Sequence, residues 1–199
     1  SKEHILASVD AALKRLKTDY ADSLLLHRPD TLMEPEEVAE AFDQLEKAGK
    51  VKHFGVSNHN PGQIELLQKY LKQPLIINQL QFSITNSGMI DRGINVNMEN
   101  AASVDHDGGI LEYCRLKNIR IQPWSPFLFG FFDGVFLDHP KFPELNALLD
   151  RMAKEKDVSK EALVIAWILR HPAKMQPVVG TTNPERLKNI CKASDIILT

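Results

Sequence analysis

Leu24-Leu25-Leu26-His27-Arg28-Pro29-Asp30-Thr31 is the stretch of this sequence that decides the fold. A short apolar run ends abruptly at a histidine, and the proline two residues later disfavours a helix. The pattern predicts a buried parallel strand that places His27 at the carboxyl edge of a sheet. Ligands and catalytic residues of α/β proteins gather at that edge. His27 is therefore a candidate catalytic residue, although a lone histidine at a strand end more often hydrogen-bonds a loop.

Helical patterns and short apolar runs alternate along the rest of the chain. In the first predicted helix Ile5, Val9, Leu13 and Leu16 recur on one face with the helical period. The alternation predicts a mostly parallel sheet with right-handed crossovers. We predict strands at 23–26, 51–56, 75–82, 119–122 and 176–179. Helices are expected at 2–17, 35–48, 60–71, 109–117, 143–156 and 159–170, with a last one opening at Asn183-Pro184-Glu185 and long loops at 86–107 and 123–139.

Two architectures accommodate five such units. One is a complete open sheet of the doubly wound kind, and the other is part of a (β/α)₈ barrel, which typically needs roughly 250 residues. Periodicity alone does not choose between them. No linker or low-complexity tract divides the 199 residues, so residues 1–199 are expected to form a single domain.

Composition excludes several classes of protein. The chain is 43% hydrophobic and 25% charged with a net charge of −2, so a nucleic-acid partner is not expected. Its apolar runs are too short to span a bilayer, and no charged-then-apolar leader opens it, which favours a cytoplasmic location. Cys114 and Cys191 lie in apolar helical patterns and are predicted to be buried thiols.

Polar or aromatic residues stand at the carboxyl ends of all five predicted strands. The amides of Asn58 and Gln79 both donate and accept, which suits a carboxamide ligand, and Trp124 could stack on a flat ring. The last helix start would expose unpaired N–H groups suited to phosphate, with Arg186 in its first turn. Each residue also has an ordinary interpretation as a turn, a helix cap or core. They become persuasive together, because one fold would bring them to one face.

Other chemistries find no support in the sequence. It contains no G-x-G-x-x-G or G-x-x-x-x-G-K-[ST] motif, and its histidines lack the spacing of metal ligands. Ser57 and Ser125 have no nucleophile elbow around them. No metal site is therefore expected.

The same strand ends resemble those of the aldo-keto reductase family. The resemblance rests on residues 16–30, 49–58, 78–83, 124–126 and 178–186, which occur in the family's order. Residues 89–93 and 107–114 resemble bacterial members of the YdhF-like type. The resemblance implies a (β/α)₈ TIM barrel, here about its last five βα units. It also implies an oxidoreductase that binds NADP(H) without a Rossmann domain and reduces aldehydes or ketones by hydride transfer.

The resemblance further implies a role for each candidate residue. His27 would orient the carbonyl of a small-molecule substrate, and Trp124 would stack on the nicotinamide. Ser57, Asn58 and Gln79 would hold the nicotinamide carboxamide. The pyrophosphate and adenosine end would be bound by Ser125, Gly180, Thr181, Thr182, Arg186 and Asn189. Many members carry a lysine where Gly180-Thr181 stands, so the preference for NADP rests mainly on Arg186.

One part of the family's catalytic group is missing. The tyrosine that donates the proton, with its lysine and aspartate, belongs to three strands that have no counterpart here. Tyr20, Tyr70 and Tyr113 are not predicted to follow strands. Without an acid the barrier to carbonyl reduction is high, so this segment alone is expected to be an inactive carboxyl-terminal portion. An open barrel exposes sheet edges, which predicts aggregation or completion by other strands. A nucleotide-binding regulatory protein without turnover is the alternative function.

Overall fold

A computed structural model describes residues 1–131 and 133–198. The chain divides into two compact units. The first unit comprises Ser1–Gln79 and Asp105–Arg120, and the second comprises Leu80–Val104 and Ile121–Thr199. The expectation of a single domain stays a prediction, and the units are described one at a time.

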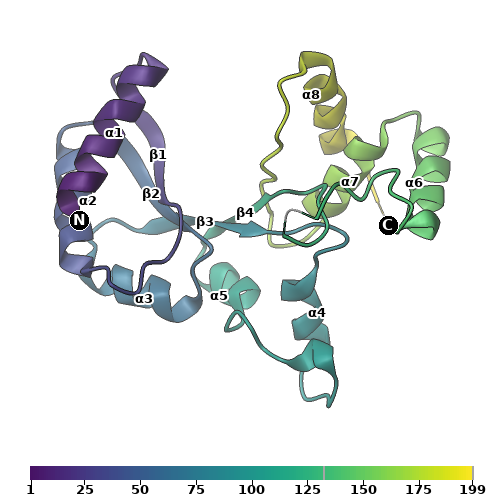
Figure 1. The fold of residues 1–199 in the computed structure, drawn as a ribbon, viewed down its shortest axis with the longest axis horizontal. Coiled ribbons are helices and arrows are strands. Elements are labelled where there is room, and N and C mark those ends of the chain that lie inside the picture. Colours follow the sequence, from purple (N-terminus) through teal and green to yellow (C-terminus); the bar gives the residue numbers. More distant parts are fainter. Residues whose placement is uncertain (132, 199) are drawn as a thin grey trace. The chain divides into compact units, whose positions relative to one another are not determined.

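Parallel strands form the centre of the first unit (Figure 1). β1 (Ala21–Leu26) pairs with β2 (Val51–Ser57), and β2 pairs with β3 (Leu75–Gln81), whose last two residues belong to the second unit. Leu26 lies opposite Val56, and Ser57 lies opposite Gln79. Because the strands are parallel and in this register, the residues that follow them leave from the same edge of the sheet.

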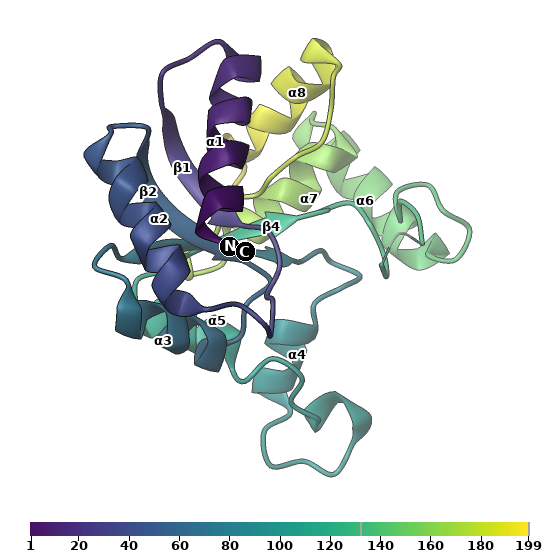
Figure 2. The same cartoon turned by 60° about the vertical axis from the view of Figure 1, so that its left-hand side comes forward.

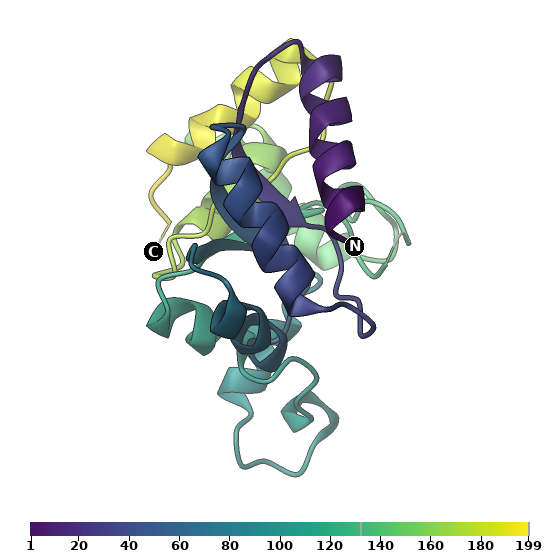
Figure 3. The ribbon, with the colours of Figure 1, turned by 90° about the vertical axis from the view of Figure 1, so that its left-hand side faces the viewer.

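The helices of the first unit are α1 (Lys2–Leu16), α2 (Pro35–Lys47), α3 (Pro61–Tyr70) and α5 (Ile110–Leu116). Figures 2 and 3 show α1 and α2 side by side, and α2 packs on β2. Helix α2 buries one face, which carries Val38, Phe42 and Leu45. The Phe42 ring stacks on Phe54 of β2 with 4.1 Å between centroids, so the core lies between helix and sheet.

The second unit holds β4 (Arg120–Trp124) from Ile121 onward, together with α4 (Gly88–Ile94), α6 (Pro143–Lys156), α7 (Lys160–Leu169) and α8 (Pro184–Cys191). Short 3₁₀ turns are η1 (Ala101–Ser103) and η2 (Lys192–Asp195). The Phe82 amide donates to the Trp124 carbonyl at 3.4 Å, so β4 runs beside the continuation of β3. Helix α7 is apolar on nearly every side and is accordingly buried.

Three expectations are wrong. No fifth strand forms at 176–179, where a single parallel bridge joins Trp124 and Val178. The Gln176 and Val178 amides donate to the Ile121 and Pro123 carbonyls at 3.0 and 2.8 Å, but Pro123 has no N–H to donate in return, so the ladder does not continue. The predicted loop at 86–107 contains α4 and η1, since Met89 supplies a buried anchor. Cys191 is exposed, because the neighbouring Ile190 takes the buried face of α8, whereas Cys114 is buried as predicted.

A groove of about 680 Å³ lies between α1 and β1. In the part of the chain that the structure describes, β1 has one neighbouring strand, β2. The groove runs along β1 and is lined mainly by apolar side chains, among them Ile5, Val9, Leu13, Leu16, Leu24, Leu26 and Leu32. Leu16, on the apolar face of the first predicted helix, is 68% exposed and Leu32 is 88% exposed, so the groove presents apolar surface to water.

We predict that the 199-residue chain, prepared alone, binds the dye ANS and self-associates through this groove. Leu16→Gln should lower the ANS fluorescence and shift sedimentation toward the monomer. Leu116→Gln is the matched control, because Leu116 also ends a helix, is 79% exposed and does not line the groove. Equal effects of the two substitutions would contradict the prediction.

Candidate functional site

His27 directly follows β1 and is exposed. It lines the end of the groove together with Arg28 and Asp30. The Asp30 carboxylate accepts a hydrogen bond from the Leu32 amide at 2.9 Å, which closes a turn in the loop that follows the strand. The predicted position of His27, at the carboxyl end of a parallel strand, is confirmed.

Ser57, Asn58 and Gln79 are brought together by a tight turn at the end of β2. Asn58 takes a left-handed conformation with φ 61°, and its amide donates to the Gln79 carbonyl at 2.8 Å. The Asn58 side-chain amide donates to Ser57 Oγ at 2.7 Å, and Ser57 Oγ donates to the same Gln79 carbonyl at 3.2 Å. The three residues therefore form one hydrogen-bonded group at the sheet edge.

Gly55 allows β2 and β3 to approach closely just before this turn. A Cβ at Gly55 would lie 2.7 Å from the Ile77 carbonyl oxygen, closer than side chains tolerate. The register between the two strands also shifts at Phe54/Gly55. The irregularity sets the alignment that puts Ser57 opposite Gln79.

Two buried polar residues, His59 and Asn78, hold the Ser57-Asn58 turn through hydrogen bonds. His59 is 3% exposed and its Nδ1 lies 2.9 Å from the Ser57 carbonyl, so Nδ1 carries the proton and donates. Asn78 is fully buried and its side-chain nitrogen donates to the His59 carbonyl at 2.9 Å. Sequence reasoning missed both residues. An asparagine inside the apolar strand Leu75–Gln81 was the available signal, because buried amides need partners.

Burial changes the titration of the groups around this support. It lowers the pKa of His59 below 6.5, its ordinary value, against the opposing effect of the hydrogen bond to Ser57. Burial also raises the pKa of the Cys114 thiol to about 12, although a hydrogen bond with Asn78 acts in the other direction. At neutral pH the support is therefore uncharged.

In the second unit Trp124 ends β4 and Ser125 turns the chain with φ 53°. The Leu128 amide donates to the Ser125 carbonyl at 3.1 Å, which closes the turn. The Trp124 indole meets the Phe131 ring edge-on, with 6.3 Å between centroids and 81° between planes. This contact holds one edge of the indole.

The start of α8 differs from the expectation in one respect. The Asn183 side chain accepts from the amides of Glu185 and Arg186 at 3.0 and 3.2 Å, so these N–H groups are not unpaired. Thr181 Oγ1 accepts from the Asn183 amide at 3.1 Å. A phosphate at this end would therefore depend on side chains more than on the helix terminus.

Arg186 is the charged side chain available for that purpose. Its Nε lies 3.6 Å from Glu161 Oε1, and its guanidinium lies 5.6 Å from the centre of the Phe127 ring. Thr181 is half-buried and Thr182 is exposed, and a Cβ at Gly180 would have nothing within 4 Å. Asn189 lies one turn after Arg186 in α8 and lines a shallow pocket of about 360 Å³ with Val158 and Lys192.

As predicted, none of the three described tyrosines follows a strand. Tyr20 precedes β1, Tyr70 ends α3, and Tyr113 lies within α5. The Tyr113 hydroxyl donates to Glu65 at 2.9 Å, and burial together with this carboxylate raises its pKa. Among the described residues, no group of three or more His, Cys, Asp or Glu could hold a metal ion, and no helix is long and apolar enough to cross a membrane.

Comparison with known proteins identifies the family. The model of the aldo/keto reductase family matches residues 1–199, and the chain belongs to this family. It is 38% identical over 190 residues to 6-dehydroglucose reductase of Agrobacterium fabrum, covering 96% of this chain and 57% of the relative. It is 34% identical to the oxidoreductase YdhF of Escherichia coli over 199 residues, covering 100% of this chain and 60% of the relative. The chain thus spans less than two thirds of the length of these relatives.

Solved structures confirm the fold class. A thermostable aldo-keto reductase crystallised with the inhibitor epalrestat matches with a TM-score of 0.75 at 23% identity, over 100% of this chain and 63% of that chain. An aldo-keto reductase complexed with NADPH matches with a TM-score of 0.72 at 18% identity, over 100% and 57%. The α/β fold is part of the (β/α)₈ barrel of this family, as the sequence predicted.

We predict that buried His59 makes the full-length protein less stable in acid. The native state has the lower His59 pKa and binds fewer protons than the unfolded state, so the free energy of unfolding falls as pH drops below about 6.5. His59→Gln should flatten the dependence of the urea midpoint on pH in this range. The exposed His53 provides the control substitution His53→Gln. An unchanged pH dependence in His59→Gln would contradict the prediction.

Proposed function

We propose that the full-length protein is an NADP(H)-dependent oxidoreductase that reduces the carbonyl group of small aldehydes or ketones to an alcohol. Its membership of the aldo/keto reductase family and the named activities of its relatives support this proposal. The 199 residues alone are proposed to be inactive, since no described tyrosine follows a strand.

The observation that carries the proposal is the hydrogen-bonded group of Ser57, Asn58 and Gln79. A carboxamide ligand needs both donors and acceptors. The Ser57 hydroxyl and the Asn58 amide lie together at this sheet edge beside the Gln79 main-chain carbonyl, and the Gln79 side chain is proposed to add a second amide. The left-handed turn at Asn58 and the buried Asn78 fix their backbone. The donor set therefore fits a nicotinamide carboxamide, and each residue is proposed to contact it.

The second unit supplies groups of a different chemistry. Trp124 is proposed to stack on the nicotinamide ring and Ser125 to contact the pyrophosphate. Arg186 would bind the 2′-phosphate with help from Gly180, Thr181 and Thr182, because guanidinium–phosphate hydrogen bonds are charge-assisted. Asn189 is proposed to lie near the adenine.

His27 is proposed to act on the substrate. A bound NADPH supplies the hydride. The ring N–H of His27 donates to the carbonyl oxygen, which orients the carbonyl and stabilises the negative charge that develops there. A separate acid must then protonate that oxygen. Tyr113 does not fit this task, because its hydroxyl already donates to Glu65 and its pKa is raised.

We also propose an alternative function, which is regulation without turnover. A nucleotide-binding regulatory protein needs the carboxamide and phosphate contacts but no acid. The two functions differ in turnover, so one experiment separates them.

The full-length protein should oxidise NADPH in the presence of a generic small aldehyde, followed by absorbance. His27→Ala should lower kcat about 10²- to 10³-fold, the usual cost of losing a donor to a developing oxyanion. His53→Ala, another exposed histidine in the first unit, serves as the control. Binding of NADPH without turnover would favour the regulatory function, and absence of NADPH binding would contradict both.

Arg186→Gln should weaken binding of NADPH about tenfold while leaving NADH nearly unchanged, because only NADPH carries the 2′-phosphate. Isothermal titration of both dinucleotides measures the difference. Arg151→Gln is the control, since Arg151 is an exposed arginine of α6 that pairs with Glu155. Equal losses for NADPH and NADH would show that Arg186 does not read the phosphate.

A further inference from the structure

The chain that leaves β4 forms a small hairpin rather than an open loop. Its arms are residues 127–129 and 134–136, and Leu128 bridges Val135 in antiparallel fashion. The Phe129 amide donates to the Gly134 carbonyl and the Phe136 amide to the Phe127 carbonyl, both at 3.0 Å. The carbonyl of Leu128 in the first arm accepts from Ser83 Oγ at 2.7 Å, which ties this arm to the segment after β3.

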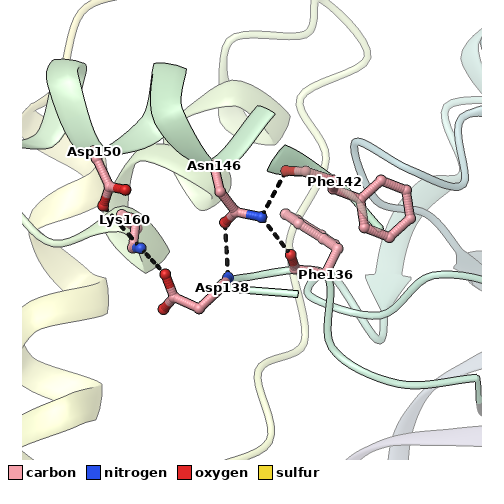
Figure 4. Close-up of polar contacts among 6 residues, drawn as sticks. All are labelled: Phe136, Asp138, Phe142, Asn146, Asp150 and Lys160. Atoms are coloured by element: carbon pink, nitrogen blue, oxygen red, sulfur yellow. Dashed lines mark hydrogen bonds and ion pairs between the residues drawn. The ribbon is translucent and has the colours of Figure 1, made fainter. Parts of the chain in front are cut away.

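Asn146 of α6 holds the other arm (Figure 4). Its side chain is 7% exposed in total and makes three hydrogen bonds to backbone groups. The nitrogen donates to the carbonyls of Phe136 and Phe142 at 2.9 Å, and the oxygen accepts from the Asp138 amide at 2.7 Å. One side chain thus fixes the end of the hairpin and the turn that follows it.

A charged pair adds a second tie to the same turn. Lys160, at the start of α7, makes a hydrogen bond and ion pair with Asp138 and another with Asp150 of α6 at 2.9 Å (Figure 4). Hydrogen bonds to these two carboxylates raise the pKa of Lys160, so Lys160 is charged at neutral pH. Asp138 has φ 58°, a conformation that asparagine also tolerates.

The hairpin contacts two of the proposed cofactor-binding residues of this unit, Trp124 and Arg186. Phe131, beyond its first arm, is 59% exposed and meets the Trp124 indole edge-on. Phe127, at its base, is buried and supplies the ring beneath the Arg186 guanidinium. A shift of the hairpin therefore moves contacts of the residue proposed to stack on the nicotinamide and of the one proposed to bind the phosphate.

We propose that Asn146 is a positioning residue for cofactor selectivity: by fixing the hairpin it holds Phe127 under Arg186 and so sets the discrimination between phosphorylated and unphosphorylated dinucleotides. The inference rests on the proposed function and deepens it. Asn146 touches no proposed cofactor-binding residue itself, and it acts through the hairpin. The contact of Phe131 with Trp124 concerns the nicotinamide, which NADPH and NADH share, so it changes both affinities alike.

The selectivity ratio separates positioning from simple damage to the fold. A partly unfolded protein loses the same fraction of its sites for NADPH and for NADH, so the ratio of the two Kd values stays constant. Loss of the Phe127 ring beneath Arg186 weakens the binding of NADPH and leaves the binding of NADH unchanged. Cation–π contacts of partly exposed arginines correspond to changes of about two- to fivefold in affinity.

The test measures Kd for NADPH and for NADH by isothermal titration of the full-length protein and its Asn146→Ala variant. We expect the ratio Kd(NADH)/Kd(NADPH) to fall about two- to fivefold. An unchanged ratio in a folded variant overturns the positioning role. If the unsubstituted protein binds neither dinucleotide, the proposed function fails together with the inference. Binding with an unchanged ratio in the variant contradicts the inference alone.

A milder pair of variants keeps the test decisive if Asn146→Ala does not fold. Asp138→Asn removes the carboxylate that Lys160 binds on the hairpin's turn and keeps the backbone bond to Asn146. Asp150→Asn removes the other partner of Lys160, which belongs to α6. The ratio should fall in Asp138→Asn and stay constant in Asp150→Asn, and equal ratios in the two variants overturn the inference.

Discussion

A buried backbone carbonyl needs a hydrogen-bond donor, and in each unit an asparagine side chain supplies one beneath a loop that carries proposed site residues. Asn78 donates to the His59 carbonyl under the Ser57-Asn58 turn, and Asn146 donates to two carbonyls beside the hairpin after Trp124. Leaving such a carbonyl unsatisfied costs about 1–3 kcal/mol, so these amides add to the backbone hydrogen bonds that hold the two loops. The geometry of the candidate residues depends on them.

Helices and strands were predictable from the sequence where a local feature, such as a capping residue, a proline or an apolar run, set their ends. Helix α3 begins after Asn60 because Asn60 and Gln63 cap each other at 2.9 Å, and α6 begins at Pro143 as expected. β1 follows from its apolar run before Pro29. The expectation failed at Val178, where flanking apolar residues suggested a strand but Pro123 of β4 has no N–H to donate to it. Hydrophobicity reports burial, whereas a strand also needs hydrogen-bond partners.

The site was predictable in its residue types and less so in its contacts. Strand-end polarity located His27, Ser57, Asn58 and Gln79, because parallel strands end at one edge. It could not show that Asn183 already satisfies two amides of α8, since a capping residue and an anion-binding terminus have the same sequence. Sequence reasoning missed His59 and Asn146 because each matters only through being buried. Nothing in the sequence distinguishes a buried polar residue in a loop or helix from an exposed one.

The distribution of roles explains how a phosphate contact at Arg186 could coexist with a capped helix. Asn183 already accepts from the terminal amides of α8, so a phosphate would have to be bound by the Arg186 side chain. Glu161 and Phe127 both contact the Arg186 guanidinium. Glu161 engages Nε at 3.6 Å, a long contact in a partly exposed setting where ion pairs contribute about 0–1 kcal/mol. A dianionic phosphate forms stronger, charge-assisted hydrogen bonds with a guanidinium and would compete successfully with so weak a pair. The ring of Phe127 would remain in place during that exchange, because the hairpin that carries it is fixed by hydrogen bonds that do not involve Arg186.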